Sequence, residues 1–264
     1  MQPRTDLAIE KIENLTENKQ KKIKEEINIT EVEINSYEKQ ELFGKKQGKY
    51  ITVEFENVEI NKKEIEMKIE KALISLLPQK REKILVAGLG NRDIISDSIG
   101  PFTAEKIIAT RHIKDEFEKE KYFEKIKSVA VSIPDVVSKT GIESAENIKA
   151  ITKIINADIV IVIDALASKS IDRLFKTVQL CNTGISPGSG VKNKRKEISE
   201  KTIGIPVIAI GVPTVVDAMS LAFELSGKEP DFKTDLIVTP KDADILCYRI
   251  SEILANAINN SLQL

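Results

Sequence analysis

Hydrophobic and polar residues alternate along two stretches of the N-terminal third of the chain, Ile27–Ile34 and Tyr50–Val58. Alternation of this kind, with many β-branched residues, is typical of half-buried strands. Residues 61–77 instead place apolar residues at helical spacing, and Pro78 follows directly. We therefore predict an amphipathic helix that ends before this proline. Residues 7–82 are expected to form a β-rich and helical N-terminal region.

The pattern changes at Lys83, where short and uninterrupted apolar runs begin. Such runs are typical of strands buried on both faces, and they occur at residues 84–88, 129–133, 159–163, 206–212 and 236–239. Helical patterns separate them, at about residues 99–111, 142–156, 214–226 and 241–258. Strands that alternate with helices predict a three-layer α/β/α fold with a mainly parallel central sheet over residues 83–264. The N-terminal strands are expected to add a smaller β element.

Composition narrows the classes of function. The 264 residues include 40 Lys and Arg against 41 Asp and Glu, so the formal net charge is −1. This balance argues against a nucleic-acid-binding protein, which usually carries a basic excess. Apolar runs never reach the length of about 18 residues that a membrane span needs. Two cysteines cannot form a disulfide framework or a Cys-rich zinc site, and a cytoplasmic, reduced setting is expected.

Two aspartates follow strands of the predicted inner sheet. Asp97 lies in the loop after the first inner strand, just before a helix, and Asp164 directly follows the apolar run 159–163. Each has an ordinary structural interpretation, as a helix cap or a turn residue. However, ligand sites in such sheets lie beyond the carboxyl ends of the strands. If the two strands are neighbours, the carboxylates converge and suit general acid–base hydrolysis.

Two glycine-rich motifs resemble known sites but lack a necessary residue. Gly88–Asp93 begins like a dinucleotide-binding loop, but Asp93 stands where the third glycine is needed. Gly184–Gly188 matches the G-x-S-x-G pattern of serine hydrolases, but Pro187 has no N–H for the oxyanion hole. The single histidine, His112, follows a helical segment. Neither nucleotide binding nor a serine triad is therefore predicted.

Two further features concern ligand binding and helix capping. Four of the five residues 192–196 are basic, which is consistent with either a solvated face or a site that attracts an acidic ligand. Thr214 is a plausible cap of the helix predicted over 214–226, with Asp217 in its first turn.

A series of motifs, in order along nearly the whole chain, resembles the germination proteases of spore-forming bacteria, which degrade small acid-soluble spore proteins. The residues that carry the resemblance are Arg4–Ala8, Gly88–Asn91, Asp97–Pro101, Thr110–His112, Thr140–Ser144, Ile163–Ala167, Thr183–Ile185, Pro187–Gly190, Asn193–Lys196, Gly204–Val207, Gly211–Ala218 and Val238–Lys241. The resemblance implies a self-processing zymogen of the spore core that assembles as a homotetramer. It also implies that Asp97 and Asp164 are the catalytic pair.

The resemblance extends to the fold of hydrogenase maturation endopeptidases, which bind nickel through two carboxylates and a histidine. Asp97 and Asp164 match the carboxylates, but His112 lies just past a helix and not on the loop that supplies the third ligand. We therefore expect no metal and no cofactor. Two alternatives stay open: a metal-dependent endopeptidase of that type, and a non-catalytic protein that binds spore proteins.

The resemblance also indicates where the chain cuts itself and binds substrate. Substrates of the family are cut after an acidic residue and before a small apolar pair, and Thr5–Ala8 fits this pattern. Cleavage between Asp6 and Leu7 would remove residues 1–6 as a short propeptide. We expect substrate contacts from four residues: Asn91, Lys194, Arg195 and Lys196. Asp135 stands where the family has a glycine, so the loop around it is expected to differ.

Overall fold

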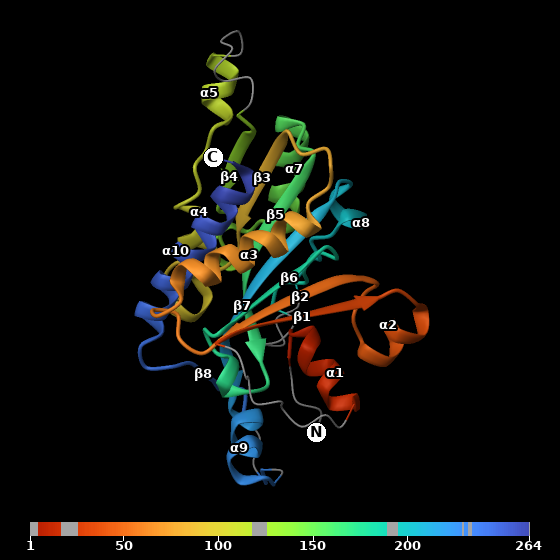
Figure 1. Ribbon diagram of the computed structural model, residues 1–264, viewed down its shortest axis with the longest axis vertical. Helices are drawn as coiled ribbons and strands as arrows, with labels where there is room; N and C mark the ends of the chain where they lie inside the picture. Colours follow the sequence, from red (N-terminus) through yellow and green to blue (C-terminus); the bar gives the residue numbers. More distant parts are fainter. Residues whose placement is uncertain are drawn as a thin grey trace.

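The computed structural model describes residues 5–16, 26–117, 126–188, 195–228, 230–231 and 234–263. These residues form one sheet of eight strands with helices on both faces (Figure 1). The strand order is β1-β2-β6-β7-β5-β3-β4, and β8 pairs with β7. The strands are β1 (Ile27–Ile34), β2 (Gly48–Phe55), β3 (Lys83–Gly88), β4 (Ser128–Ser132), β5 (Ile159–Ser168), β6 (Thr177–Cys181), β7 (Val207–Asp217) and β8 (Ile237–Val238).

The inner strands β4, β3, β5 and β7 are parallel, and the outer strands are antiparallel. The predicted α/β fold with a mainly parallel central sheet is therefore confirmed. The N-terminal strands β1 and β2, expected to add a smaller β element, join the same sheet through β6. The C-terminal run 236–239 differs from expectation, since it contributes only the short strand β8, in which Ile237 is 50% exposed.

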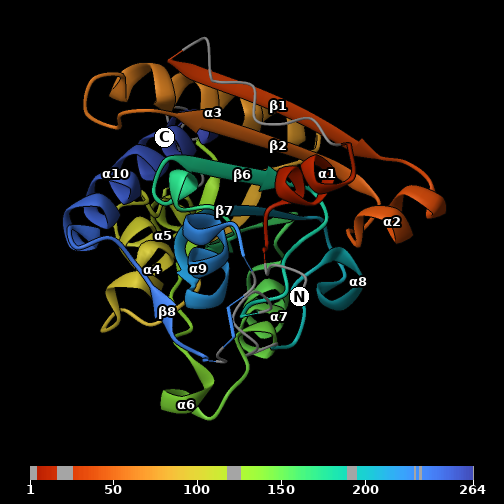
Figure 2. The ribbon, with the colours of Figure 1, turned by 90° about the horizontal axis from the view of Figure 1, so that it is seen from below.

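Helices cover the sheet on both faces because side chains of the inner strands point alternately to either side. Ile84 and Val86 of β3 pack in one cluster with α3 (Lys62–Leu76) and α10 (Ala243–Leu262). Leu85 and Ala87 of the same strand pack with α7 (Ser144–Ile155) and α8 (Glu200–Ile203) on the other face. Figure 2 shows α3 and α7 on opposite sides of the strands. This two-sided burial explains the uninterrupted apolar runs of the sequence.

The other helices lie at the edges and ends of this core. They are α1 (Ala8–Thr16), α2 (Tyr37–Phe43), α4 (Ile99–Ala104), α5 (Arg111–Glu116), α6 (Val137–Thr140) and α9 (Ala218–Ser226), with the 3-10 turns η1 (Ile95–Asp97) and η2 (Ile171–Arg173). The predicted helix 99–111 is thus divided into α4 and the start of α5. No helix of the described ranges is long and apolar enough to cross a membrane.

The helix predicted over 214–226 begins later than expected. Strand β7 continues through Pro213 and Thr214 to Asp217, which is the N-cap of α9 and accepts a hydrogen bond from the N–H of Ser220 at 3.0 Å. Thr214 instead lies within the strand, and its hydroxyl donates to the carbonyl oxygen of Ser96 at 2.6 Å. This bond joins β7 to the loop that follows β3.

Candidate active site

Asp164 lies at the point where β5 is no longer paired with β3. The last paired residues of β3 and β5 are Gly88 and Ile163, so Asp164 is the first residue of β5 beyond the end of β3. On the other side Asp164 still pairs with Gly211 of β7. Strand β5 therefore continues beyond Asp164, whereas the sequence suggested that it ends there. The sheet opens at Asp164 because β3 no longer pairs with β5. The Asp164 side chain is only 5% exposed, and it faces the loop that follows β3.

That loop carries Asp97 in the turn η1. The backbone N–H of Asn91 donates to the Asp97 carboxylate at 2.8 Å, which closes the loop on itself. Gly90 makes this possible, because its φ of +110° is rarely adopted by other residues and an added Cβ would lie 2.0 Å from the carbonyl oxygen of Asp97. The Asp97 carboxylate does not cap a helix, so the capping interpretation from the sequence does not hold here.

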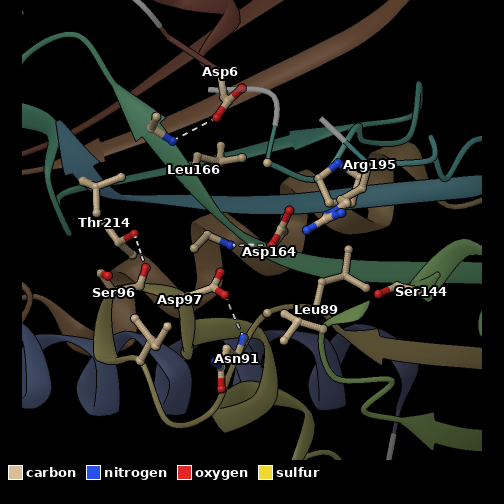
Figure 3. Close-up of a pocket in the computed structure, with 18 of the residues that line it drawn as sticks. Asp6, Leu89, Asn91, Ser96, Asp97, Ser144, Asp164, Leu166, Arg195 and Thr214 are labelled. Carbon is tan, nitrogen blue, oxygen red and sulfur yellow. Dashed lines mark hydrogen bonds between the residues drawn. The ribbon is translucent and has the colours of Figure 1, made fainter. Parts of the chain in front are cut away.

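The two carboxylates line one cavity of about 350 Å³, which we call the first cavity. Figure 3 shows Asp97 and Asp164 directed into this space from the loop and from β5. Asp6, Asn91 and Arg195 also line it. A second cavity, of about 280 Å³, adjoins the first, since Asp6, Asp164, Ala165 and Leu166 line both. Together the cavities form a groove that is large enough for a short length of peptide.

Burial and charge shift the acidity of both aspartates. Burial raises the pKa of Asp164 well above its ordinary value, and the carboxylates of Asp97 and Asp6 raise it further. Burial also raises the pKa of Asp97, with a contribution from the Asp135 carboxylate, but the hydrogen bond from Asn91 opposes this rise. Such a pair favours one protonated and one ionised carboxyl group, which is the requirement for acid–base catalysis.

The N-terminal segment lies along the rim of this site. Asp6 donates its backbone N–H to the carbonyl oxygen of Ala167 at 2.9 Å, and its carboxylate accepts the N–H of the same residue at 2.9 Å. Leu7 is fully buried and packs with Leu166 and Ile185. Asp6, whose bond to Leu7 the sequence predicts to be cut, lines one cavity with Asp97 and Asp164.

The remaining predicted site residues divide into three groups. Arg195 lines the first cavity, and its side chain extends toward Asp164 in Figure 3. Lys196 instead forms an exposed ion pair with Glu146 of α7. Lys194 lies outside the described residues. Asn91 lines the cavity and also orders the loop, because its side chain accepts the N–H of Asp93 at 3.0 Å.

Two side chains at the site were not anticipated from the sequence. The Lys45 ammonium group, from the loop after α2, donates to the carbonyl oxygen of Asp6 at 2.6 Å. The side chain of Gln179, on β6, accepts the N–H of Ala8 at 2.6 Å. A glutamine inside the apolar run 177–181 is a weak signal of a buried polar role. Nothing in the sequence around Lys45 distinguishes it from the many other lysines.

The described residues do not offer the ligands of a nickel site. Among them, no group of three or more His, Cys, Asp or Glu side chains is placed to hold a metal ion. His112 is exposed on α5, which projects from the end of the molecule opposite α9 (Figure 1). Asp97 and Asp164 therefore lack the histidine that a two-carboxylate and one-histidine site requires.

Comparison with known proteins agrees with the sequence motifs. The family model for germination protease matches residues 2–225. A germination protease of Clostridium tetani is 38% identical over 100% of this chain and 96% of its own length. That of Caldanaerobacter subterraneus is 36% identical over 98% and 94%. A solved NiFe hydrogenase maturation protease from Thermococcus kodakarensis covers 72% of this chain and 99% of its own, with a TM-score of 0.40 and 15% identity. The chain belongs to the germination protease family, a family of proteases that act in spore germination.

Proposed function

We propose that this protein is an endopeptidase that starts the degradation of small acid-soluble spore proteins during germination and cuts them after an acidic residue. The observation that carries this proposal is the cavity that Asp97 and Asp164 line together with Asp6, an acidic residue of the chain's own N-terminal segment. Two carboxyl groups with raised pKa values beside a peptide are suited to acid–base hydrolysis.

In the proposed mechanism, Asp97 is the base and Asp164 is the acid. Asp97 accepts the Asn91 hydrogen bond, which favours its ionised form, while burial keeps Asp164 protonated to a higher pH. Asp97 takes a proton from water as the water oxygen attacks the carbonyl carbon of the substrate. Asp164 then gives its proton to the leaving amine as the C–N bond breaks.

We further propose that the chain is a zymogen that removes its own residues 1–6. Thr5–Ala8 has the sequence expected of a substrate, and its Asp6 lines both cavities. Arg195 lines the same cavity as Asp6 and supplies a positive charge for the acidic residue before the cut. Leu7 is buried against Leu166 and Ile185, which is the environment that an apolar residue after the cut requires.

Assembly as a homotetramer in the spore core, which is cytoplasmic, is part of the same proposal. The family resemblance supports it, and so does a set of exposed apolar side chains near α9 and β8. These are Phe223, Leu225, Leu236 and Ile237. Light scattering after size-exclusion chromatography tests the assembly, with four chains per particle expected.

The decisive experiment compares wild type with Asp97→Asn and Asp164→Asn on a purified small acid-soluble spore protein. We expect either substitution to reduce the cleavage rate by at least about 100-fold, because each removes one partner of the proton transfer. Near-normal cleavage by either variant would contradict the two-carboxylate mechanism. Activity that a chelator abolishes and one metal restores would favour the metal-dependent alternative, and binding without any cleavage would favour a binding protein.

A further inference from the structure

The carbonyl oxygen of Asp6 lies between two side-chain donors. Lys45 Nζ donates to it at 2.6 Å, and Gln179 Nε2 donates at 3.4 Å. This carbonyl belongs to the Asp6–Leu7 bond, at which the proposed self-processing occurs. Hydrogen-bond donors directed at a carbonyl oxygen stabilise the negative charge that develops there when the carbonyl carbon is attacked. The hydrogen bonds from Lys45 and Gln179 therefore hold the Asp6 carbonyl in place and would also stabilise an oxyanion on it.

The position of Lys45 suits this chemistry. Lys45 is half-buried in the loop after α2, and its side chain lines the second cavity together with Asp164. Burial lowers the pKa of Lys45, and the Asp6 carboxylate opposes that effect. Removing an ammonium group from water is costly unless it is paired, and here the ammonium group donates a hydrogen bond to a peptide carbonyl. A positive charge held in low dielectric acts strongly on a nearby oxyanion.

Gln179 binds the backbone on either side of Leu7, the residue that follows this peptide bond. Its Oε1 accepts the N–H of Ala8 at 2.6 Å, while its Nε2 donates to the carbonyl oxygen of Asp6. Gln179 is 7% exposed on β6, so its amide is fixed by the sheet. The two bonds bracket Leu7, the residue after the proposed cut. Both use backbone groups, so they do not depend on the side chains of the bound segment.

We propose that Lys45 is a third catalytic residue, which stabilises the oxyanion formed on the carbonyl before the cut, and that Gln179 positions the backbone on either side of Leu7, the residue after the cut. This inference rests on the proposed function, because it takes Asp6–Leu7 as a bond that the site cleaves. With Lys45, the proposed site has one positive group in addition to the two carboxylates. Gln179 of β6 recognises the backbone of the bound peptide.

The reaction balances with water as the only co-reactant. The water oxygen bonds to the carbonyl carbon of Asp6, one water proton passes to the ionised aspartate, and the carbonyl electron pair moves onto the oxygen that Lys45 contacts. The carbonyl then reforms as the C–N bond breaks. The Leu7 nitrogen takes the proton of the protonated aspartate and leaves as an amine. Lys45 gives up no proton and stabilises charge only.

The test follows self-processing of the full chain by intact mass spectrometry. We expect Lys45→Met to slow the loss of residues 1–6 by at least about 100-fold, since removing one oxyanion donor costs about 100- to 1,000-fold. Lys45→Gln keeps a donor without the charge, so it should be slowed less but still by more than about tenfold. Lys49→Met is the matched control, because the Lys49 ammonium group pairs with Glu31 at 2.8 Å on the neighbouring strands, and its rate should equal wild type.

Hydrogen exchange separates catalysis from anchoring of the segment. Residues 5–16 should keep their wild-type exchange protection in both Lys45 variants, because Glu10 independently holds α1 by accepting the N–H of Lys169 at 2.8 Å. A slowed rate with matching loss of protection would show that Lys45 only anchors the segment, which overturns the inference. Processing at the wild-type rate in both variants would also overturn it while leaving the two-aspartate mechanism intact. A wild-type chain that cleaves spore proteins but never itself contradicts this inference and the proposed self-processing, but not the proposed endopeptidase activity. A chain that cleaves neither contradicts the endopeptidase activity as well.

Discussion

The carboxylates of Asp97 and Asp164 line one cavity but lie in different environments. Asp97 sits on a loop and accepts the N–H of Asn91 at 2.8 Å. Asp164 sits on a strand, is 5% exposed, and accepts the N–H of Ala165 at 3.0 Å. Burial and the neighbouring acidic groups raise the pKa of Asp164 well above its ordinary value. Because the two environments differ, the two carboxyl groups can be studied separately, through the pH dependence of stability and of the cleavage rate.

The first prediction concerns stability as a function of pH in Asp164→Asn. Because the folded chain raises the pKa of Asp164, the stability that its protonated form contributes is complete below the ordinary carboxyl pKa and is lost as pH rises through the raised pKa. Asparagine has no charge to bury, so the variant escapes this loss. We expect it to be more stable than wild type at neutral pH, by about 1.4 kcal/mol for each unit of pKa shift.

Urea denaturation between pH 4 and pH 8 measures this difference. The control is Asp244→Asn, which removes a carboxyl group that is exposed on α10 rather than buried. If Asp164→Asn and wild type lose stability in parallel over this range, Asp164 is not held protonated by the fold.

The second prediction concerns the acidic limb of the pH–rate profile. Burial raises the pKa of Asp97, and the charge of Asp135 contributes to that rise. Asp135→Asn removes this charge, and asparagine tolerates the left-handed φ of 58° that Asp135 adopts. We therefore expect the pKa of Asp97 to fall and the acidic limb to move to lower pH. The limb is measured from kcat/KM for peptide cleavage.

Asp93→Asn is the matched control for this shift. The Asp93 carboxylate pairs with Lys139 at 2.7 Å, but it does not contribute to the pKa shift of Asp97. The acidic limb of the pH–rate profile of Asp93→Asn should coincide with that of wild type. A limb that stays in place in Asp135→Asn, or that moves equally in both variants, would be inconsistent with Asp97 as the titrating base.

Most of the fold could be predicted because burial on two faces leaves a clear pattern. The starts of β3, β4 and β5 lie within one residue of the apolar runs. β6 was missed because Thr177 and Gln179 interrupt its apolar character, although both are buried in the sheet. The apolar run at 236–239 was misleading because β8 pairs with β7 only at Val216 and Asp217 and leaves Ile237 exposed.

The site could be predicted only where it follows from the parallel sheet. Asp97 follows β3 and Asp164 lies on β5, and these strands are parallel neighbours in the sheet, so the topology brings the two residues to one edge. Lys45 and Gln179 reach the site through the antiparallel pairing of β2 with β6, which joins residues more than 120 positions apart. No local pattern encodes that pairing. The contact of Asp6 with Ala167 is of the same long-range kind.

The third prediction uses the glycine that shapes the Asp97 loop. An added Cβ at Gly90 would lie 2.0 Å from the carbonyl oxygen of Asp97 and 2.9 Å from its carboxylate. Gly90→Ala must therefore displace Asp97, and we expect a loss of about 2–4 kcal/mol in the free energy of unfolding together with loss of cleavage. Gly141→Ala has a comparable φ of +72° with open space around it, and it should cost only about 1 kcal/mol and leave cleavage intact. Equal effects of the two substitutions would show that backbone strain, and not the collision, determines the loss.

The fourth prediction concerns the ion cluster that attaches α1 to the sheet. The guanidinium of Arg173 is 12% exposed and donates to Glu13 at 2.8 Å and 3.0 Å and to Glu54 at 2.8 Å, with Glu10 3.3 Å away. It therefore joins α1, η2 and β2 through one side chain. Arg173→Met leaves three glutamates without this partner, and we expect a loss of about 3–5 kcal/mol. Lysine should not restore it, because an ammonium group cannot make the paired bonds to Glu13.

Arg173→Met should also slow self-processing, because α1 begins two residues after Asp6 and holds Asp6 at the cavity. Denaturant unfolding and intact mass measured on the same samples test both effects. The control is Arg249→Met, whose ion pair with Glu59 is half-exposed and should contribute at most about 1 kcal/mol. An Arg173→Met chain that unfolds more readily but still loses residues 1–6 at the wild-type rate would show that the cluster stabilises the fold without placing the Asp6–Leu7 bond.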